Sequence, residues 1–244
     1  MPSTLGTTAL RTVERVWETR MGAREGSLGS SAVSFVEWPG FSAAVVLSLG
    51  DALLVAGPGE AIKQLRDLPR QKLLDVASLE GALKALSPDL VGKALLAYTD
   101  ESPSTPAGTS NNVHEVTRVE VEEVLSYCET DECDESGLLE MNRWFVADDD
   151  GVPVAAAGYE EWSNGVAHLG VAVSRAHRGR DLGRSVASAA ISHALREHSV
   201  AQWRSRDTNT SSTLLGERLG FVQVGAQIAF DLRASEPAYA APAR

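Results

Sequence analysis

The sequence predicts an α/β fold of the α+β kind, in which a smaller α/β N-terminal domain precedes a larger mixed sheet flanked by helices. Short apolar runs bounded by Gly, Pro and Asp alternate with segments whose apolar residues recur at helical spacing. The chain has 244 residues, of which 43% are hydrophobic. That length and composition are enough to bury the core of a sheet together with its covering helices.

The first hundred residues contain three predicted strands followed by two predicted helices. The strands lie at residues 32–38, 43–50 and 52–58, and turns containing Gly separate them. The helices lie at residues 59–69 and 78–88, and each stops at a proline. This part carries no chemical motif. It is open whether it is a degenerate copy of the second half, a lid, or a dimerisation domain that would make the protein a homodimer.

A polar segment divides the chain. Residues 101–112 read "ESPSTPAGTSNN", a composition that buries too little apolar surface to order itself. The Ala- and Pro-rich residues 234–244 resemble it and predict a flexible tail. We therefore expect an N-terminal domain at 1–100, a linker at 101–112, and a second domain at 113–233.

The second domain alternates predicted strands and helices more clearly. Strands are predicted at residues 113–119, twice within 143–162 around an Asp-Asp-Asp-Gly turn, and at 165–174, 200–206 and 221–232, the last as a strand or hairpin. Helices are predicted at residues 120–130, 183–198 and 211–220. This order favours a mixed α/β sheet.

Charge and cysteine content exclude several classes of protein. The chain has 33 acidic and 22 basic residues, a net charge of -11, which disfavours nucleic acid and anionic membrane surfaces as partners. Cys128 and Cys133 are the only cysteines, too few for a disulfide framework or a zinc site, so we expect reduced thiols and no metal. No secretory pattern and no apolar run of about 18 residues is present, so we expect a cytoplasmic protein.

One loop combines arginines and glycines at the start of a predicted helix. In "HRGRDLGRSVASAA", residues 177–190, it follows a strand, and four arginines fall within residues 175–184. The free N–H groups and the positive dipole end of a helix N-terminus attract anions, and glycines let the backbone approach them. Two readings stay open: a phosphate cradle, or a surface turn whose Asp181 caps the helix. The spacing matches neither a G-x-G-x-x-G nor a G-x-x-x-x-G-K-[ST] motif.

Two motifs in order resemble the GNAT N-acetyltransferase superfamily. The loop motif [R/Q]-x-x-G-x-[G/A] is present as "RGRDLG" from Arg178 to Gly183, and a later Asn with a Gly-Phe element is present as Asn209, Ser212 and "LGERLGF". The resemblance covers residues 113–232. It implies a mostly antiparallel mixed sheet flanked by helices, and transfer of an acetyl group from acetyl-CoA to an amine, here expected to belong to a small molecule.

The resemblance also assigns coenzyme A contacts. It implies that the backbone of Val171, Ala172 and Val173 pairs with the pantetheine arm, and that Asn209 and Ser212 lie near the pantetheine or adenine end. It implies that the amides of the loop hold the pyrophosphate, with arginines at its rim. The residues concerned are Arg178, Gly179, Arg180, Asp181, Leu182, Gly183 and Arg184.

Two positions depart from the family pattern. Asp181 replaces the middle glycine and places a carboxylate near a diphosphate, a repulsion that neighbouring arginines or an outward-turned side chain would offset. Gly216 stands where many members carry a tyrosine that reprotonates the departing thiolate. These departures favour an alternative function, an acyl-CoA-binding regulatory module without catalysis.

Acetyl transfer needs a base for the amine and a donor that polarises the thioester carbonyl. Glu160, Glu161 and His168 are the candidate bases, and Tyr159 is a further candidate proton donor. A backbone amide near Val171 is the candidate carbonyl donor. Strand alternation places one of the two glutamates on the site face without saying which. The plain alternatives are a solvated strand end for the glutamates and a satisfied strand histidine for His168.

An acidic run precedes the predicted strand pair. Residues 119–136 contain eight acidic residues and no basic one. In the family, helices at this position flank the acceptor pocket, so an acidic wall would favour a cationic amine. The other reading is a solvated helix face.

Overall fold

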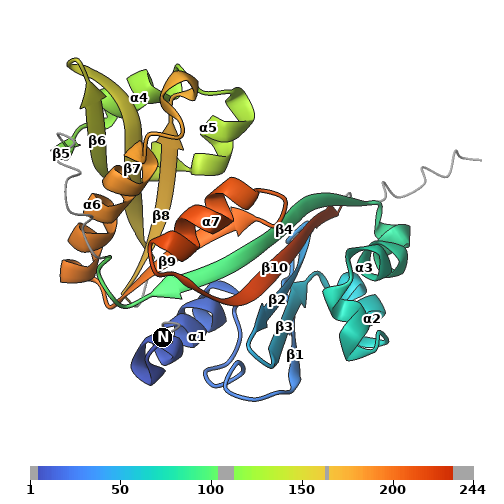
Figure 1. Ribbon diagram of the computed structural model, residues 1–244. Helices are drawn as coiled ribbons and strands as arrows, with labels where there is room; N and C mark the ends of the chain where they lie inside the picture. Colours follow the sequence, from blue (N-terminus) through green and yellow to red (C-terminus); the bar gives the residue numbers. More distant parts are fainter. Residues whose placement is uncertain (1–4, 104–112, 163–164, 233–244) are drawn as a thin grey trace, which may run out of the picture. The chain divides into compact units, whose positions relative to one another are not determined.

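The computed structural model describes residues 5–103, 113–162 and 165–232 (Figure 1). The helices are α1 (Thr7–Arg20), α2 (Gly59–Arg66), α3 (Val76–Leu83), α4 (Arg118–Leu125), α5 (Thr130–Ser136), α6 (Leu182–Glu197) and α7 (Thr210–Arg218). The strands are β1 (Val33–Glu37), β2 (Ala43–Leu49), β3 (Ala52–Gly57), β4 (Pro88–Thr99), β5 (Val113–Val116), β6 (Arg143–Asp149), β7 (Val152–Trp162), β8 (Val166–Val173), β9 (Val200–Arg206) and β10 (Val222–Leu232).

The chain forms two compact units that alternate along the sequence. The first unit takes its described residues from Met1–Val16 and Leu96–Gln223, and the second takes them from Trp17–Leu95 and Val224–Arg244. Both β4 and β10 contribute residues to each unit, so the units do not follow chain order. Independent domains at residues 1–100 and 113–233 stay a prediction, and most of the predicted linker and the whole predicted tail lie outside the described residues.

In the first unit the strands follow the order β4-β9-β8-β7-β6-β5. The pairs from β5 to β8 are antiparallel, and β8 pairs with β9 in parallel. Val166 to Gly170 of β8 run antiparallel to Trp162 to Gly158 of β7 without a break in register. This confirms the expected mixed, mostly antiparallel sheet flanked by helices.

Helices cover both faces of that sheet, and the ribbon shows α6 on one side of β6 to β8 with α4 and α5 on the other (Figure 1). On the first side, which we name the α6 face, Val186 and Ile191 of α6 pack on Phe145 and Ala157 with no exposed surface of their own. The opposite side, the α4/α5 face, buries Val121 and Val124 of α4 against Val146 and Ala156. Side-chain alternation therefore assigns every residue of β7 and β8 to one of these two faces.

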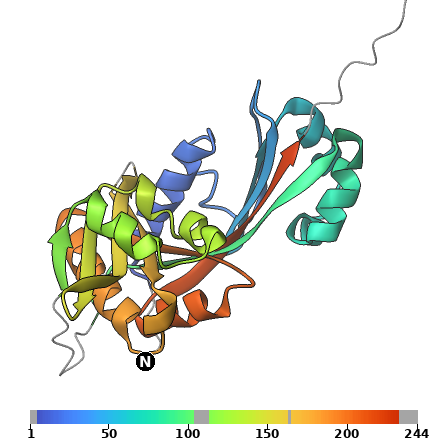
Figure 2. The ribbon, with the colours of Figure 1, turned by 90° about the horizontal axis from the view of Figure 1, so that it is seen from above.

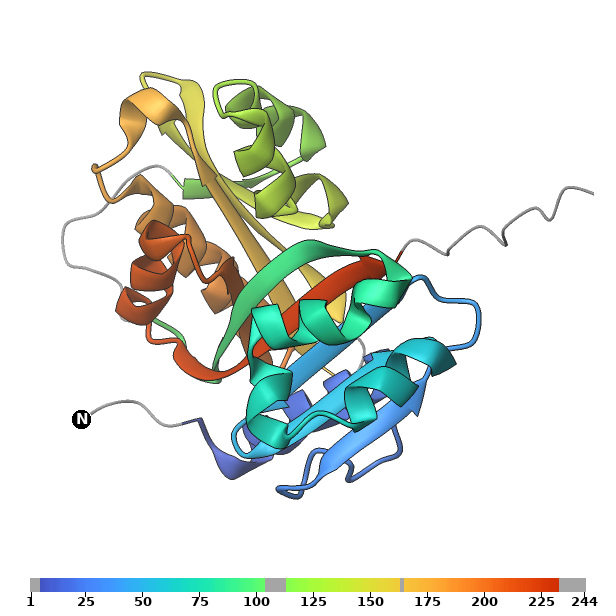
Figure 3. The ribbon, with the colours of Figure 1, turned by 90° about the vertical axis from the view of Figure 1, so that its right-hand side faces the viewer.

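The second unit is an α/β structure that combines strands from the N-terminal part of the chain with most of β10. Its strands follow the order β1-β3-β2-β10, with β1 parallel to β3 and the other pairs antiparallel. The helices α2 and α3 lie side by side over the blue strands (Figures 2 and 3). Ile62, Leu65 and Leu79 of these helices are fully buried against Val55 and Phe230.

The sequence analysis missed three elements: α1, β4 and α5. β4 continues from the proline at which we ended the preceding helix, and only its second half alternates buried and partly buried residues. None of the described helices combines the length and the apolar character that crossing a bilayer requires.

Candidate active site

The centre of the site is the place where β8 and β9 stop pairing. Their parallel register includes Val166 with Val200, Ala167 with Ala201 and His168 with Gln202. Among the described residues, no later residue of β8, from Leu169 to Val173, has a partner on β9. Since a strand edge that lacks a neighbour presents unpaired N–H and C=O groups, this segment can pair with an extended ligand.

The loop after β8 leads into α6 with its amides open. Gly179 and Asp181 have φ values of 76° and 57°, in the left-handed region, and space around Gly179 is free. The first recorded helical bond runs from the Ser185 amide to the Asp181 carbonyl at 3.0 Å. Within the described chain, no amide from Gly179 to Arg184 donates to a protein acceptor. The helix therefore aims unsatisfied N–H groups and its positive dipole end outward.

Asp181 occupies the N-cap position of α6, but its side chain does not cap the helix. The alternative reading of this loop, a turn closed by an Asp181 cap, is therefore wrong. Left-handed torsions explain why glycine suits this position, and aspartate is among the few other residues that adopt them. The Asp181 side chain is exposed, while the adjoining Leu182 and Gly183 are buried against the first unit's core.

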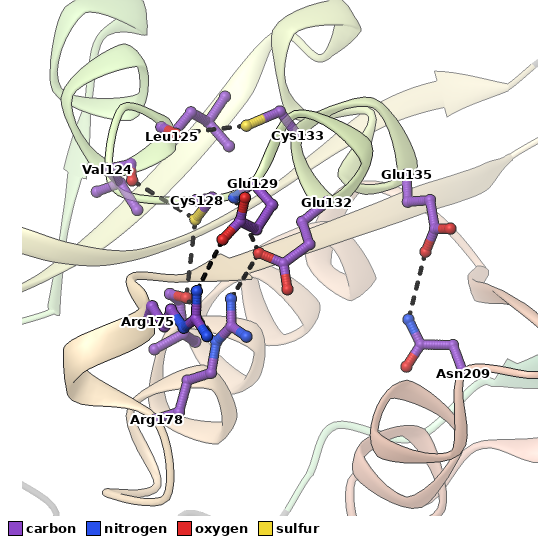
Figure 4. Close-up of polar contacts among 11 residues, drawn as sticks. Val124, Leu125, Cys128, Glu129, Glu132, Cys133, Glu135, Arg175, Arg178 and Asn209 are labelled. Atoms are coloured by element: carbon purple, nitrogen blue, oxygen red, sulfur yellow. Dashed lines mark hydrogen bonds and ion pairs between the residues drawn. The ribbon is translucent and has the colours of Figure 1, made fainter.

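Three of the four loop arginines engage carboxylates. Arg175 donates to Glu129 at 2.8 Å, and Arg178 donates to Glu132 at 2.7 Å (Figure 4). The bidentate pair of Arg180 with Asp149 has N–O distances of 2.7 and 3.1 Å. Arg184 has no ion-pair partner among the described residues.

These contacts shift the pKa values of both partners in the direction expected for ion pairs. The Arg178 hydrogen bond lowers the pKa of the Glu132 carboxyl, and the Arg180 hydrogen bond lowers that of Asp149. Each guanidinium has a correspondingly raised pKa. The arginines that the resemblance places beside a diphosphate are thus already held by carboxylates, which a diphosphate would have to displace or share.

Helix α5 reaches both sides of the place where β8 and β9 diverge. Glu129 and Glu132 bind the loop after β8, whereas Glu135 accepts from Asn209 at 3.4 Å (Figure 4). Glu135 also pairs with Arg206 at the end of β9 at 2.9 Å. Of the eight acidic residues in 119–136, these three and Glu122, which pairs with Arg118, engage arginines. Half of the acidic run is therefore compensated locally.

The two cysteines lie close to this helix as free thiols. Cys128 donates weakly to the Val124 and Val173 carbonyls at 3.6 and 3.7 Å, and Cys133 donates to Leu125 at 3.3 Å (Figure 4). Burial is the main cause that raises the pKa of both thiols. Both side chains therefore serve as partly buried packing groups in the protonated form.

Asn209 and Ser212 close the start of α7. The Asn209 side chain is the N-cap and accepts from the Ser212 amide at 3.0 Å, while Ser212 accepts from the Trp203 indole at 3.1 Å. A Cβ at Gly216 would lie 3.0 to 3.2 Å from three atoms of the Trp203 ring system. The predicted coenzyme contacts of Asn209 and Ser212 stay predictions, and Gly216 is explained by the indole that packs on it.

Among the candidate bases, the structure brings Glu160 and His168 together. They are direct cross-strand partners on β7 and β8, and alternation from Ala156 and Ala172 places both on the α4/α5 face. Trp162 stacks on the His168 ring at a centroid distance of 4.7 Å and donates to Glu160 at 2.6 Å. Of the two glutamates, Glu160 is therefore the one that shares a face with His168.

Glu161 and Tyr159 point to the α6 face. Glu161 is exposed, and Tyr159 is buried beside α6, where its hydroxyl lies 2.8 Å from Nδ1 of His193 and donates to Glu197 at 3.3 Å. Burial, followed by the Glu197 charge, raises the pKa of Tyr159 to about 12. Neither residue shares a face with His168.

Two residues that sequence reasoning missed lie beside Glu160 and His168 on the same face of the sheet. Gln202 is fully buried on β9 opposite His168, and its amide nitrogen donates to the hydroxyl of buried Tyr98 on β4 at 2.6 Å. Four side chains thus lie on one face of four neighbouring strands, and we call them the polar row: Glu160, His168, Gln202 and Tyr98. A buried glutamine is uncommon enough to serve as a signal, but Tyr98 lies outside the segment that resembles the family.

The α4/α5 face is closely covered just beyond this row. Gly158 and Gly170 are cross-strand partners, and a Cβ on Gly170 would lie 2.0 Å from the Ser136 carbonyl oxygen and 2.6 Å from Met141. Only glycine allows the end of α5 to contact β8 here. The same contact fixes the α5 segment over the strand end that diverges from β9.

These residues fit an acyl-CoA molecule. The edge of β8 beyond His168 can pair with the amides of an extended arm, and the open amides at the start of α6 can bind phosphate oxygens. Arg184 adds a cation without a carboxylate partner in the described part of the chain. The Asp181 carboxylate would repel the phosphates, but its side chain is exposed, so solvent and salt screen its charge.

One family of known proteins matches part of this chain. The model of the Acetyltransferase (GNAT) family matches residues 109–221. No curated protein sequence matches the chain. Among solved structures, it is similar to a GNAT-family protein from Novosphingobium aromaticivorans, with 21% identity and a TM-score of 0.49 over 61% of this chain and 68% of that one.

Two further similar structures are related to the same group. A GCN5-related N-acetyltransferase from Kribbella flavida is 19% identical, with a TM-score of 0.46 over 75% of this chain and 69% of that one. A GCN5-related N-acetyltransferase-like protein from Streptococcus suis is 18% identical, with a TM-score of 0.46 over 79% and 84%.

Residues 109–221 form a GNAT acetyltransferase domain, and its family implies acyl transfer from acyl-CoA.

Proposed function

We propose that this protein is an N-acetyltransferase that transfers the acetyl group of acetyl-CoA to an amine of a small molecule. The observation that carries the proposal is the divergence of β8 and β9 after His168, directly before the open amides at the start of α6. A strand edge that can pair with an extended arm and a loop that can bind phosphate therefore follow each other along the chain. Bound acetyl-CoA supplies the activated acetyl thioester.

The polar row supports the base that this reaction needs. An amine attacks only when it is neutral, and imidazole is the candidate group whose ordinary pKa lies closest to neutral pH, which favours His168 as the base. Glu160 lies beside it, bonded to Trp162, and can favour the protonated imidazole electrostatically. A β8 amide near Gly170 is placed to polarise a carbonyl on the free edge. Glu161 has no part in this proposal because it points to the other face.

The acidic run supports a cationic acceptor. Four of its carboxylates lack an arginine partner among the described residues, namely Glu120, Glu123, Asp131 and Asp134. A net negative surface raises the local concentration of a cationic amine and repels an acidic one. Equal turnover of cationic and neutral amines at low salt would contradict this part of the proposal.

One observation favours a second function, acyl-CoA binding without catalysis. The family's usual proton donor is replaced by Gly216, and the Trp203 ring would crowd a larger side chain there. A thiolate without that donor leaves with the help of water or not at all. If it does not leave, the protein keeps coenzyme affinity as a regulatory module.

Thiol release separates the two functions. We expect purified full-length protein to release coenzyme A from acetyl-CoA when a panel of cationic and neutral amines is added. Glu160→Gln should lower kcat/KM about tenfold or more, whereas the matched variant Glu161→Gln should stay within about twofold of wild type. Calorimetric binding of acetyl-CoA without release for any amine supports the regulatory module, and no heat beyond dilution overturns both functions.

A further inference from the structure

The buried glutamine of the polar row has one satisfied and one unsatisfied end. Gln202 has no exposed surface, and its Nε2 donates to the Tyr98 hydroxyl at 2.6 Å. Its Oε1 is shielded from solvent and has no hydrogen-bond partner among the described residues. Buried carbonyl oxygens are almost always bonded, so an unsatisfied one in a folded core calls for a functional explanation.

The position of Gln202 connects it with the proposed reaction. It forms the last recorded pair with β8, opposite His168, and directly after this pair the two strands diverge. Paired residues on neighbouring parallel strands have their Cα atoms about 5 Å apart and point to the same face. Gln202 therefore shares its face with His168 and Glu160, at the point where β8 and β9 stop pairing.

We propose that Gln202 determines specificity for primary amines by accepting, through Oε1, the second N–H of the acceptor. This inference rests on the proposed function and adds a substrate class to it. A neutral primary amine carries two hydrogens on the attacking nitrogen. One can face the imidazole of His168, and the other then has Gln202 as its acceptor. A secondary amine or an alcohol offers only one hydrogen.

The balance of the transfer agrees with this division of hydrogens. The amine nitrogen forms a bond to the acyl carbon, and the bond from that carbon to sulfur breaks. The nitrogen loses one proton, which His168 accepts, and the thiolate gains one proton from a water molecule, which the protonated imidazole replenishes, so that it leaves as a thiol. The other hydrogen stays in the amide product. The Gln202 bond is thus kept from substrate to product, and it orients the nitrogen without taking part in proton transfer.

Tyr98 acts as a positioning residue for this acceptor. Because its hydroxyl holds the nitrogen end of the Gln202 amide, the oxygen end is fixed in the opposite direction. A site built to bond a substrate hydrogen discriminates strongly against an analogue that lacks it. Loss of the Tyr98 hydroxyl should therefore weaken discrimination less than loss of the Gln202 carbonyl.

The test compares a primary amine with its N-methyl counterpart as acceptors for the full-length protein. Wild type should prefer the primary amine at least tenfold in kcat/KM. Gln202→Met, which keeps the side-chain length, should lower this preference about tenfold and leave the KM for acetyl-CoA within about twofold. Tyr98→Phe should lower the preference by a smaller factor, about threefold. Gln227→Met is the matched control, since Gln227 also carries a buried unbonded Oε1 but lies on β10 in the second unit.

The outcomes separate this inference from the proposed function. A wild-type protein that releases thiol equally fast with both amines, or a Gln202→Met variant that keeps the preference, overturns the role of Gln202 and leaves the acetyltransferase standing. A wild-type protein that releases no thiol with any amine overturns both. If Gln202→Met does not fold, the wild-type preference and the Tyr98→Phe variant decide.

Discussion

The polar side chains on the two faces of the first unit's sheet differ in their hydrogen bonding. On the α6 face, the hydroxyl of Tyr159 contacts both His193 and Glu197, and His198 packs edge-on against the same ring. On the α4/α5 face, the row that contains His168 ends at Gln202, whose carbonyl oxygen is buried without a partner among the described residues. Both faces contain histidines next to aromatic rings.

The difference teaches how to separate structural from functional histidines in this sheet. An unbonded buried polar atom costs about 1–3 kcal/mol, so a fold that keeps one forgoes stability. Violations of local rules of this kind are expected at functional sites. By this criterion the bonded cluster of Tyr159, His193 and Glu197 contributes to stability, and the row that ends at Gln202 serves the reaction.

The strongest test of this comparison exchanges one histidine on each face. His168→Gln should lower kcat/KM about 10²- to 10³-fold, the usual range for loss of a general base, with little change in Tm. His193→Gln should lower Tm because Tyr159 loses a bonded partner, and it should leave kcat/KM within about twofold. Steady-state kinetics and thermal unfolding measure both effects. The reverse pattern would show that the roles of the two faces are assigned the wrong way round.

Close packing on the α4/α5 face gives the next largest effect, on stability. In Gly170→Ala, the new Cβ would meet the Ser136 carbonyl at 2.0 Å, and backbone atoms must move to admit it. We expect a loss of about 3 kcal/mol in the free energy of unfolding, as for overpacked cores. Gly81→Ala in α3 is the control, since its Cβ meets open space and should add about 0.5–1 kcal/mol. Equal denaturation midpoints for the two variants would show that α5 does not press on β8.

Titration of Tyr159 tests the α6 face. Its pKa is about 12 in the folded protein against an ordinary value of 10.0, so folding favours the neutral phenol. The stability that this contributes is complete below pH 10 and is lost as the pH rises through 12. The free energy of unfolding should therefore fall more steeply between pH 10 and 12 for wild type than for Tyr159→Phe. Parallel curves would place the hydroxyl in solvent.

Much of this arrangement could be predicted from the sequence, and the missing part has a common physical cause. Local periodicity predicted every strand except β4, and it predicted the helix α6, because alternation and helical spacing act over a few residues. It left Glu160 and Glu161 equivalent, since only the cross-strand partner His168 tells the two faces apart. Tyr98 was missed because its bond to Gln202 joins residues 104 positions apart.

The ionic partners of the loop were missed for the same reason. The arginines around Gly179 were expected to stay free for phosphate, yet Arg178 meets Glu132 across 46 positions and Arg180 meets Asp149 across 31. Charge spacing in a sequence reports only pairs a turn or two apart, such as Arg118 with Glu122. Long-range pairs depend on how β8 and α5 are placed by the sheet.

The smallest expected effect concerns the contact that α5 makes with this loop. Glu132→Gln removes the charge that holds Arg178, and the amide oxygen of glutamine can still accept from the Glu129 backbone as the capping box requires. Because exposed ion pairs contribute about 0.2–1 kcal/mol, the freed arginine should tighten acetyl-CoA binding about two- to fivefold. Glu122→Gln is the matched control, since its partner Arg118 lies outside the loop and affinity should not change. Calorimetric titration at low and high salt measures both variants. Unchanged affinity in Glu132→Gln would mean that Arg178 does not contact the coenzyme, and the phosphate cradle would then depend on the α6 amides and Arg184 alone.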